Sequence, residues 1–195
     1  MSSEVIGQSF EGRDQRVLKI CKDGCGNKPA MWIDGSVHAR EWISASTVMW
    51  FIRQLTEDLS GQEYLIDSLD WYILPVNNPD GYLYTQTDDR LWRKTRSFFD
   101  PNVCIGTDAN RNWDFHFAEE GASDISCADT YHGPSGFSEV EIANVRDFIT
   151  PIQDTVKFWN SIHSYSQFVL LPWGWTTDLP EDFDELKAVA DKVQA

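Results

Sequence analysis

The segment "DGSVHAREWIS" (Asp34–Ser44) joins an apolar stretch to a long amphipathic one, and it places a histidine three residues before a glutamate. Upstream, "AMWID" (30–34) is typical of a short buried strand. Downstream, apolar residues recur at helical spacing from Trp42 to Leu59. The segment therefore predicts a strand that passes directly into a helix, with His38 and Glu41 at the junction.

The rest of the chain alternates between predicted strands and predicted helices. Ser138 and Glu141 have the spacing of a capping box, and "NNPDG" (77–81) indicates a turn. The alternation predicts an α/β fold, with a mixed, partly parallel central sheet covered by helices on both faces. Strands are predicted over 16–20, 30–34, 69–76 and 155–164, and helices over 42–59, 138–149 and 179–195.

The composition is that of an acidic globular chain. Its 195 residues suit one domain, and 16 basic against 31 acidic residues give a net charge of −15. Such a charge repels phosphate groups, so we expect no nucleic acid partner and no binding to an anionic membrane. No apolar run approaches the ~20 residues that span a bilayer. The N-terminal "MSSEVIGQSFEGRDQR" (1–16) shows no secretory signal.

Two segments share the spacing His-x-x-Glu, for which chance predicts about 0.6 occurrences with an acidic fourth residue. His38 follows a predicted strand, whereas His116, three residues before Glu119, lies in an irregular segment. His163 ends the strand 155–164, so it is expected at the same sheet edge as His38. Two histidines and Glu41 at that edge match a zinc site with an open fourth position. The alternative is a polar helix start beside a capped strand end.

Five motifs occur in order along the chain: "HAREWIS", "NPDGY", "RLWRKTRS", "DANRNWDF" and "IHSYSQ". Together they resemble the catalytic domain of the zinc metallocarboxypeptidases of the carboxypeptidase A/B family, from about Val5 to about Val193. The resemblance implies a peptidase that removes single amino acids from the C-termini of peptides and proteins. It also implies one Zn(2+) per chain, bound by His38, Glu41 and His163.

The resemblance further implies catalytic and orienting residues. Arg96, assisted by Arg93, corresponds to the cation that polarises the scissile carbonyl and stabilises its oxyanion. Asp108 corresponds to the carboxylate that orients a ligand histidine. From the residues alone, a solvated basic run is the favoured interpretation of Arg93, Lys94 and Arg96.

Four more residues are implied to contact the substrate. Asn110 and Arg111 correspond to the pair that binds the free C-terminal carboxylate, for which a guanidinium is a matched donor. Arg40 and Tyr165 match positions that line the subsites before the scissile bond. A simple turn and a core tyrosine are the alternatives for these segments.

The four cysteines permit two disulfides. Cys104 and Cys127 match a disulfide of the family, whose loop of about 24 residues would contribute roughly 3 kcal/mol. Cys21 and Cys25 lie outside the family's common pattern, and a thiol pair, a short disulfide loop and a metal site remain open for them. The resemblance implies an extracellular protein that is a monomer when complete.

The chain is shorter than the resemblance implies. We expect residues 1–195 to be a single partial peptidase domain that lacks its first stretch and its C-terminal third, with a fold incomplete at both ends. The general-base glutamate and the residue that selects A-type or B-type side chains would then lie elsewhere, so the chain alone is expected to be inactive. The alternatives are a non-catalytic zinc-binding relative and an unrelated acidic binding module.

Overall fold

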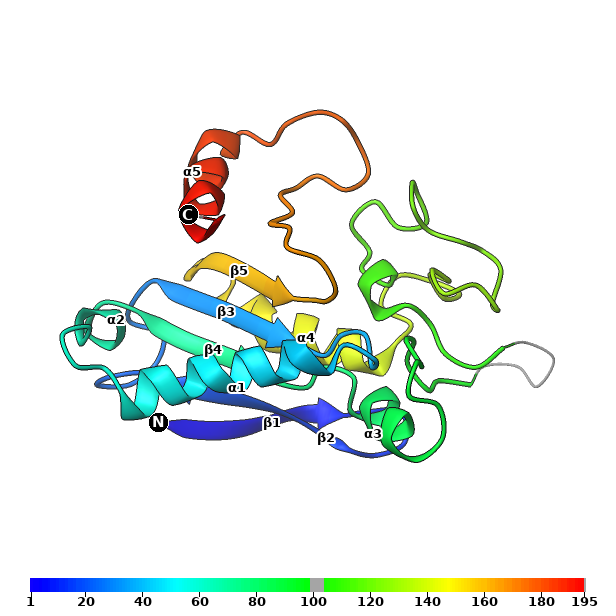
Figure 1. Cartoon of the computed structure of the whole chain (residues 1–195), viewed down its shortest axis with the longest axis horizontal. Helices are drawn as coiled ribbons and strands as arrows, with labels where there is room; N and C mark the ends of the chain where they lie inside the picture. The colour runs from blue at the N-terminus through cyan, green and yellow to red at the C-terminus, as the bar shows by residue number, and fades with distance from the viewer. Residues whose placement is uncertain (99–103, 195) are drawn as a thin grey trace.

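The computed structural model describes residues 1–98 and 104–194. Its centre is a five-stranded sheet with the strand order β1-β2-β4-β3-β5 (Figure 1). β2 pairs antiparallel with β1 and β4, whereas β3 pairs parallel with β4 and β5. The elements are β1 (Ser2–Gln8), β2 (Asp14–Ile20), β3 (Ala30–Gly35), α1 (Trp42–Glu57), α2 (Tyr64–Asp67), β4 (Asp70–Leu74), α3 (Pro79–Thr87), η1 (Ala109–Arg111), α4 (Val140–Ile149), η2 (Thr150–Ile152), β5 (Val156–Ile162) and α5 (Phe183–Gln194).

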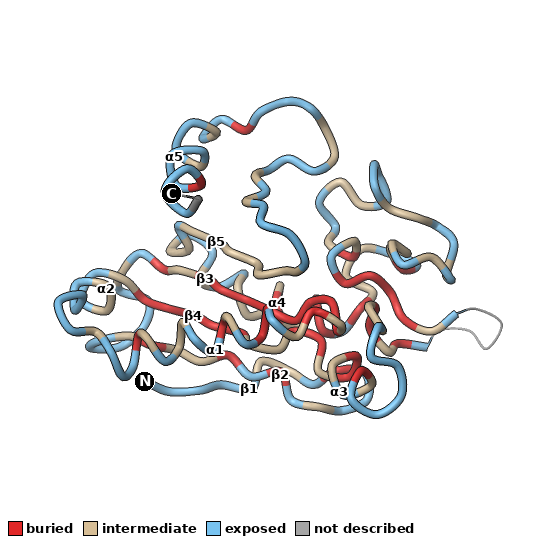
Figure 2. Tube along the Cα trace, in the orientation of Figure 1, coloured by how far each residue is buried: buried red, intermediate tan, exposed pale blue. Residues whose placement is uncertain are grey.

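Different helices bury the two faces of the sheet. In β3, Trp32 belongs to the core cluster that contains Val145 of α4, while its neighbour Ile33 belongs to the cluster that contains Val48 of α1. Successive strand residues point to opposite faces, so each strand contributes to both clusters. Figure 1 shows α1 and α4 on opposite sides of the sheet, and Figure 2 shows buried residues concentrated along β3 and β4. The predicted mixed sheet with helices on both faces is confirmed.

The elements β1 and α3 differ from the sequence prediction. β1 was not predicted, because it pairs only with β2 and most of its residues are exposed, which hides any apolar period. The "NNPDG" segment begins α3 instead of forming a simple turn. Asn78 Oδ1 accepts from the Gly81 N–H at 2.9 Å, and Pro79 occupies the first helical position, where its missing N–H costs nothing.

The capping box predicted for α4 is wrong, although the helix ends at Ile149 as expected. The Ser138 hydroxyl accepts from Asn112 Nδ2 at 2.8 Å, and Glu141 Oε1 accepts from the Phe10 N–H at 3.0 Å. Both side chains therefore bind distant partners, and no side chain caps the helix at Glu139.

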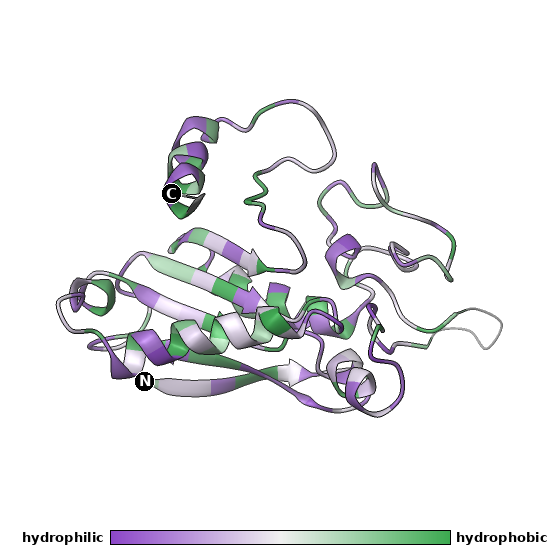
Figure 3. Ribbon diagram, viewed as in Figure 1, coloured by the Kyte–Doolittle hydropathy of each residue, from purple (hydrophilic) through white to green (hydrophobic). Residues whose placement is uncertain are grey.

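The last helix, α5, is confirmed as an amphipathic segment beyond β5 (Figure 1), with alternating hydropathy along its turns (Figure 3). Val189 and Val193 remain exposed, and Figure 2 shows most of α5 exposed as well. Within the described part of the chain, no helix has the length and apolar character needed to cross a membrane.

Glu141 makes the fold sensitive to pH. Burial, reinforced by the charges of Glu139 and Asp80, raises the pKa of Glu141 to about 7. The folded chain therefore holds a proton that the unfolded chain releases, so stability falls as pH rises from about 4.5 to about 7. The neutral variant Glu141→Gln should remove roughly 3 kcal/mol of this loss. Urea unfolding at pH 5 and pH 8 measures it. An unchanged pH slope, relative to the exposed control Glu181→Gln, would contradict the assignment.

Candidate metal centre

The end of β3 and the start of α1 are tied together by close packing. A Cβ on Gly35 would lie 2.9 Å from Val48 Cγ2 of α1, so only glycine lets the strand approach this helix so closely. The Ser36 N–H donates to Ser44 Oγ at 2.8 Å, and Ser44 Oγ donates to the Glu41 carbonyl at 2.7 Å. Glu41 is the N-cap residue of α1, but its side chain makes no cap hydrogen bond. Its carboxylate faces the end of the sheet instead.

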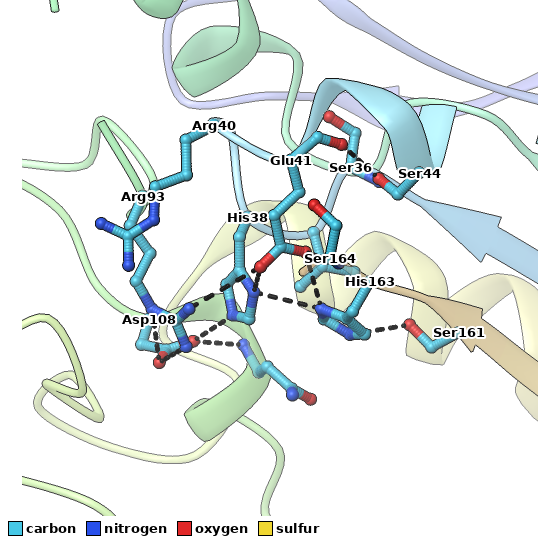
Figure 4. A network of polar contacts seen from close by, with 12 residues as sticks. Ser36, His38, Arg40, Glu41, Ser44, Arg93, Asp108, Ser161, His163 and Ser164 are labelled. Carbon is cyan, nitrogen blue, oxygen red and sulfur yellow. Dashed lines mark hydrogen bonds and ion pairs between the residues drawn. The ribbon is translucent and has the colours of Figure 1, made fainter. Parts of the chain in front are cut away.

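Three side chains that could bind a metal ion converge at this edge of the sheet, as Figure 4 shows. His38 Nδ1 lies 2.9 Å from Glu41 Oε1 and 3.1 Å from His163 Nδ1, and His163 Nδ1 lies 3.0 Å from Glu41 Oε2. Two imidazole nitrogens at that separation repel each other unless a proton or a cation lies between them. Two nitrogens and one carboxylate are the ligand set typical of a catalytic zinc site, so these residues fit that ion.

Asp108 holds His38 in the orientation that such a site needs. Its Oδ1 accepts from His38 Nε2 and from the Asn110 N–H, both at 3.0 Å, and its Oδ2 accepts from Arg93 Nη2 at 2.8 Å. Because Nε2 donates to Asp108, the lone pair of His38 lies on Nδ1, which faces Glu41 and His163.

The charges at the centre favour ionised carboxylates. Burial opposes ionisation of Glu41, but its contacts with the His163 and His38 rings outweigh it and lower the pKa of Glu41 to about 2. Burial likewise opposes ionisation of Asp108, and its contacts with His38 and Arg93 lower its pKa to about 2. For His38, burial opposes protonation, while hydrogen bonds with Asp108 and Glu41 raise its pKa overall.

The structure places Arg93, and not Arg96, beside the ligand set. Arg93 Nη1 lies 3.9 Å from Glu41 Oε1, and the Arg93 carbonyl accepts from the Ala39 N–H at 3.0 Å, which fixes the two segments together. The Arg96 guanidinium instead stacks on Tyr84, with its Cζ 3.7 Å from the ring centroid, and it also contacts the Trp92 ring and Glu11. Arg93 therefore lies nearer to the ligand set than Arg96, which the resemblance ranks first for the oxyanion role.

Asn110 and Arg111 form the short helix η1, next to Asp108. Asn110 lines both an apolar cavity of about 520 Å³, beside Trp113 and Trp159, and a smaller cavity of about 240 Å³ that Arg111 also lines. Arg111 donates to the carbonyls of Gly121 and Asn110. It forms no ion pair with a carboxylate in residues 1–98 and 104–194, so its charge is available to a ligand.

The other two predicted substrate contacts lie at the surface. Arg40 is half-buried, and its Nη1 lies 3.2 Å from Asp129 Oδ2. Tyr165 follows the ligand His163 by two residues and is 96% exposed, which excludes the alternative of a core tyrosine.

The second His-x-x-Glu pair lies apart from the metal centre. His116 Nδ1 contacts Glu119 at 3.0 Å, and its ring stacks on Trp175 with centroids 3.5 Å apart. Among the residues that the structure describes, only His38, Glu41 and His163 group as potential metal ligands. The pair that follows a strand is thus the one that groups with a second histidine, as its position in the sequence predicts.

Both possible disulfides form. Cys104 bonds to Cys127, as the resemblance implied, and closes the segment that carries Asp108 and Arg111. Cys21 bonds to Cys25, which resolves the alternatives left open for "CKDGC" and excludes a metal site there.

Sequence reasoning missed the residues behind His163. Ser161 Oγ lies 3.3 Å from His163 Nε2 and donates to Asp34 Oδ1 at 2.7 Å, while Trp32 Nε1 donates to Asp34 Oδ2 at 2.6 Å. Burial raises the pKa of Asp34, although the Ser161 and Trp32 hydrogen bonds favour its ionised form. An acid inside a buried apolar strand, and a serine two residues before a ligand, were the available signals.

Comparison with known proteins gives consistent matches. Residues 1–195 match the family described as zinc carboxypeptidase. The chain is 47% identical to carboxypeptidase B of Astacus astacus over 190 residues, covering 97% of the chain and 62% of that protein. It is 47% identical to carboxypeptidase A1 of Bos taurus over 189 residues, covering 95% and 44%.

Solved structures agree in fold. Thrombin activatable fibrinolysis inhibitor superimposes with a TM-score of 0.92 at 41% identity, covering 98% of this chain and 49% of that one. Carboxypeptidase A from Helicoverpa armigera gives a TM-score of 0.92 at 34% identity, covering 98% and 47%. The chain thus spans between 44% and 62% of the length of these proteins. The matched family, the two relatives and the fold agree with the His38–Glu41–His163 geometry, and the chain belongs to the zinc carboxypeptidase family.

Proposed function

We propose that this chain provides the metal-binding and carboxylate-binding part of a zinc-dependent carboxypeptidase that removes single C-terminal amino acids from peptides and proteins. The observation that carries this proposal is the convergence of His38, Glu41 and His163 beside the half-buried Arg93. Zn(2+), one per chain, would be held by the Nδ1 atoms of the two histidines and by the Glu41 carboxylate. When bound, it supplies a Lewis acid that polarises a carbonyl and makes water more acidic.

The arginines near the metal centre have different proposed roles. We propose that Arg93 stabilises the oxyanion, because its Nη1 faces the ligand set while its other nitrogens are fixed by Asp108. Arg111, with Asn110, would bind the C-terminal carboxylate, because its guanidinium forms no ion pair with a carboxylate of the described residues. Arg40 and Tyr165 would contact residues before the scissile bond.

The general base lies outside the carboxylates of the centre in this proposal. Glu41 contacts both histidines, and Asp108 accepts from His38, Asn110 and Arg93. Asp34 accepts from Trp32 and Ser161. Each is already used in positioning, so we expect this chain to bind substrate and metal but to turn substrate over slowly, because a missing base costs roughly 10²–10⁴-fold.

The disulfides and the net charge bear on where the protein acts and on its partners. Two disulfides favour an oxidising compartment, so we propose an extracellular location. The net charge of −15 argues against nucleic acid partners, and we propose a monomer that acts on peptide or protein C-termini.

Titration of the zinc-loaded chain with one peptide in two forms, with a free and with an amidated C-terminus, tests this function. The free form should bind more tightly. Arg111→Ala should weaken its binding roughly 10- to 100-fold and leave the amidated form unchanged, because a charged hydrogen bond contributes about 1.5–3 kcal/mol. Arg16→Ala, at an exposed arginine of β2, is the matched control.

Equal affinity for the free and amidated peptides would contradict the proposed function. Turnover is the second measurement, made on the same samples. Slow, chelator-sensitive release of one C-terminal residue from the free peptide alone is expected. Turnover as fast as that of carboxypeptidase B of Astacus astacus would instead place the general base within this chain.

A further inference from the structure

The two histidines of the metal centre are oriented by different means. His38 Nε2 contacts the Asp108 carboxylate directly at 3.0 Å. His163 Nε2 has no such direct carboxylate within the described residues; it lies 3.3 Å from the Ser161 hydroxyl (Figure 4), and that hydroxyl contacts buried Asp34 at 2.7 Å. The ring of His163 therefore depends on a hydroxyl that is itself held by a carboxylate.

The register of the sheet produces this arrangement. β3 and β5 run parallel with Asp34 opposite Ser161 and Trp32 opposite Trp159. Residues two apart in a strand share a face, so Trp32 and Asp34 lie on the same face as Ser161, and His163 continues that row just beyond the end of β5. A slip of one residue between these strands would turn Ser161 away from Asp34.

While Asp34 is ionised, its carboxylate can only accept hydrogen bonds, so Trp32 and Ser161 must both donate to it. Trp32 Nε1 can only donate, and it donates to Asp34 Oδ2 at 2.6 Å. The Ser161 hydroxyl donates to Asp34 Oδ1, so its oxygen remains as an acceptor for the Nε2–H of His163. With its proton on Nε2, His163 presents a lone pair at Nδ1, the atom that faces Glu41 and His38.

We propose that Ser161 and Asp34 are positioning residues for the metal ligand His163, which they hold in the tautomer and ring orientation that binds the metal through Nδ1. The inference rests on the proposed zinc site. Neither residue contacts the ion in this scheme; each acts through His163. Partners of this kind typically change metal affinity by 10- to 100-fold when they are removed.

A matched pair of substitutions at Ser161 isolates the hydroxyl. Ser161→Thr keeps it, whereas Ser161→Val has the shape of threonine without the hydroxyl, and Ser161 lines the cavity of about 520 Å³. Zinc affinity, measured by competition with a chelator, should fall about 10-fold in Ser161→Val and stay within about twofold in Ser161→Thr. Thr47→Val, which removes an exposed hydroxyl of α1, should change nothing.

Asp34→Asn tests the same row from its other end. To accept from Trp32, the asparagine must turn its NH2 group toward Ser161, whose own hydroxyl proton then points to His163 Nε2. This favours the tautomer with its proton on Nδ1, which cannot bind the metal, so affinity should again fall about 10-fold or more. The double variant Ser161→Val/Asp34→Asn should be no weaker than the weaker single variant, because both act through one row.

Two further measurements distinguish positioning from folding. Thermal unfolding of the metal-free chain should stay cooperative in both variants, with a lower melting temperature in Ser161→Val because Asp34 Oδ1 loses its donor. The visible spectrum of the Co²⁺-loaded chain should change in Ser161→Val and not in Ser161→Thr. Equal zinc affinity of these two variants, or additive losses in the double variant, would overturn the inference alone. Failure of the unmodified chain to bind zinc would overturn the proposed function, and the inference with it.

Discussion

The His163→Ala variant should retain far less than one equivalent of zinc after dialysis, whereas the unmodified chain should retain about one equivalent. The substitution removes one of three converging ligands and leaves Glu41 Oε2 with only the Ser164 N–H, at 3.2 Å, as a described hydrogen-bond partner. The loss of affinity should exceed the 10- to 100-fold that removal of a supporting residue costs. Metal analysis of the dialysed protein measures it.

His116→Ala is the matched control, because His116 also lies three residues before a glutamate and contacts it at 3.0 Å. This variant should keep a full equivalent. A chelator should lower the melting temperature of the unmodified chain and of His116→Ala, but not that of His163→Ala, since only a bound ion stabilises the folded state. Equal zinc in the two histidine variants would show that the ion binds somewhere else.

The convergence of His38 and His163 could be predicted from sequence because it depends on strand ends. The carboxyl ends of parallel strands lie at one edge, so a histidine after 30–34 and another at the end of 155–164 are expected at that edge, and the pairing of β3 with β5 makes them neighbours. The same reasoning dismissed His116, which follows no strand. Local pattern and topology agreed at these positions, and the structure confirms the fold that they predict.

Other features depended on contacts that no local pattern encodes. Arg93 and Arg96 lie three residues apart in an irregular segment, where spacing does not determine which side a residue faces. The Arg96 guanidinium packs against the rings of Tyr84 and Trp92. Capping-box spacing at Ser138 failed because Asn112 offers its hydroxyl a distant donor. Ser161 and Asp34 meet only once the register of β3 and β5 is known.

The placement of Arg93 leads to the second large effect. A peptide phosphonate, whose tetrahedral anionic oxygens stand in for the oxyanion, should bind the zinc-loaded chain roughly 10²–10³-fold more weakly after Arg93→Ala. The affinity of the corresponding amide peptide should fall less, because an oxyanion contact strengthens only in the transition state. Titrations at saturating zinc, with metal content verified in each sample, separate this effect from loss of support for Asp108.

Arg96→Ala is the decisive comparison, because the sequence ranked Arg96 first. Its guanidinium lies against the Tyr84 and Trp92 rings, so its removal should lower thermal stability by about 1–2 kcal/mol through lost cation–π contacts. Phosphonate affinity should stay within about threefold, since nothing holds Arg96 near the ligand set in the described structure. A strong loss of phosphonate binding in Arg96→Ala, with Arg93→Ala unaffected, would return the oxyanion role to Arg96. It would also mean that this segment rearranges when substrate binds, because the two side chains occupy separate environments in the structure described here.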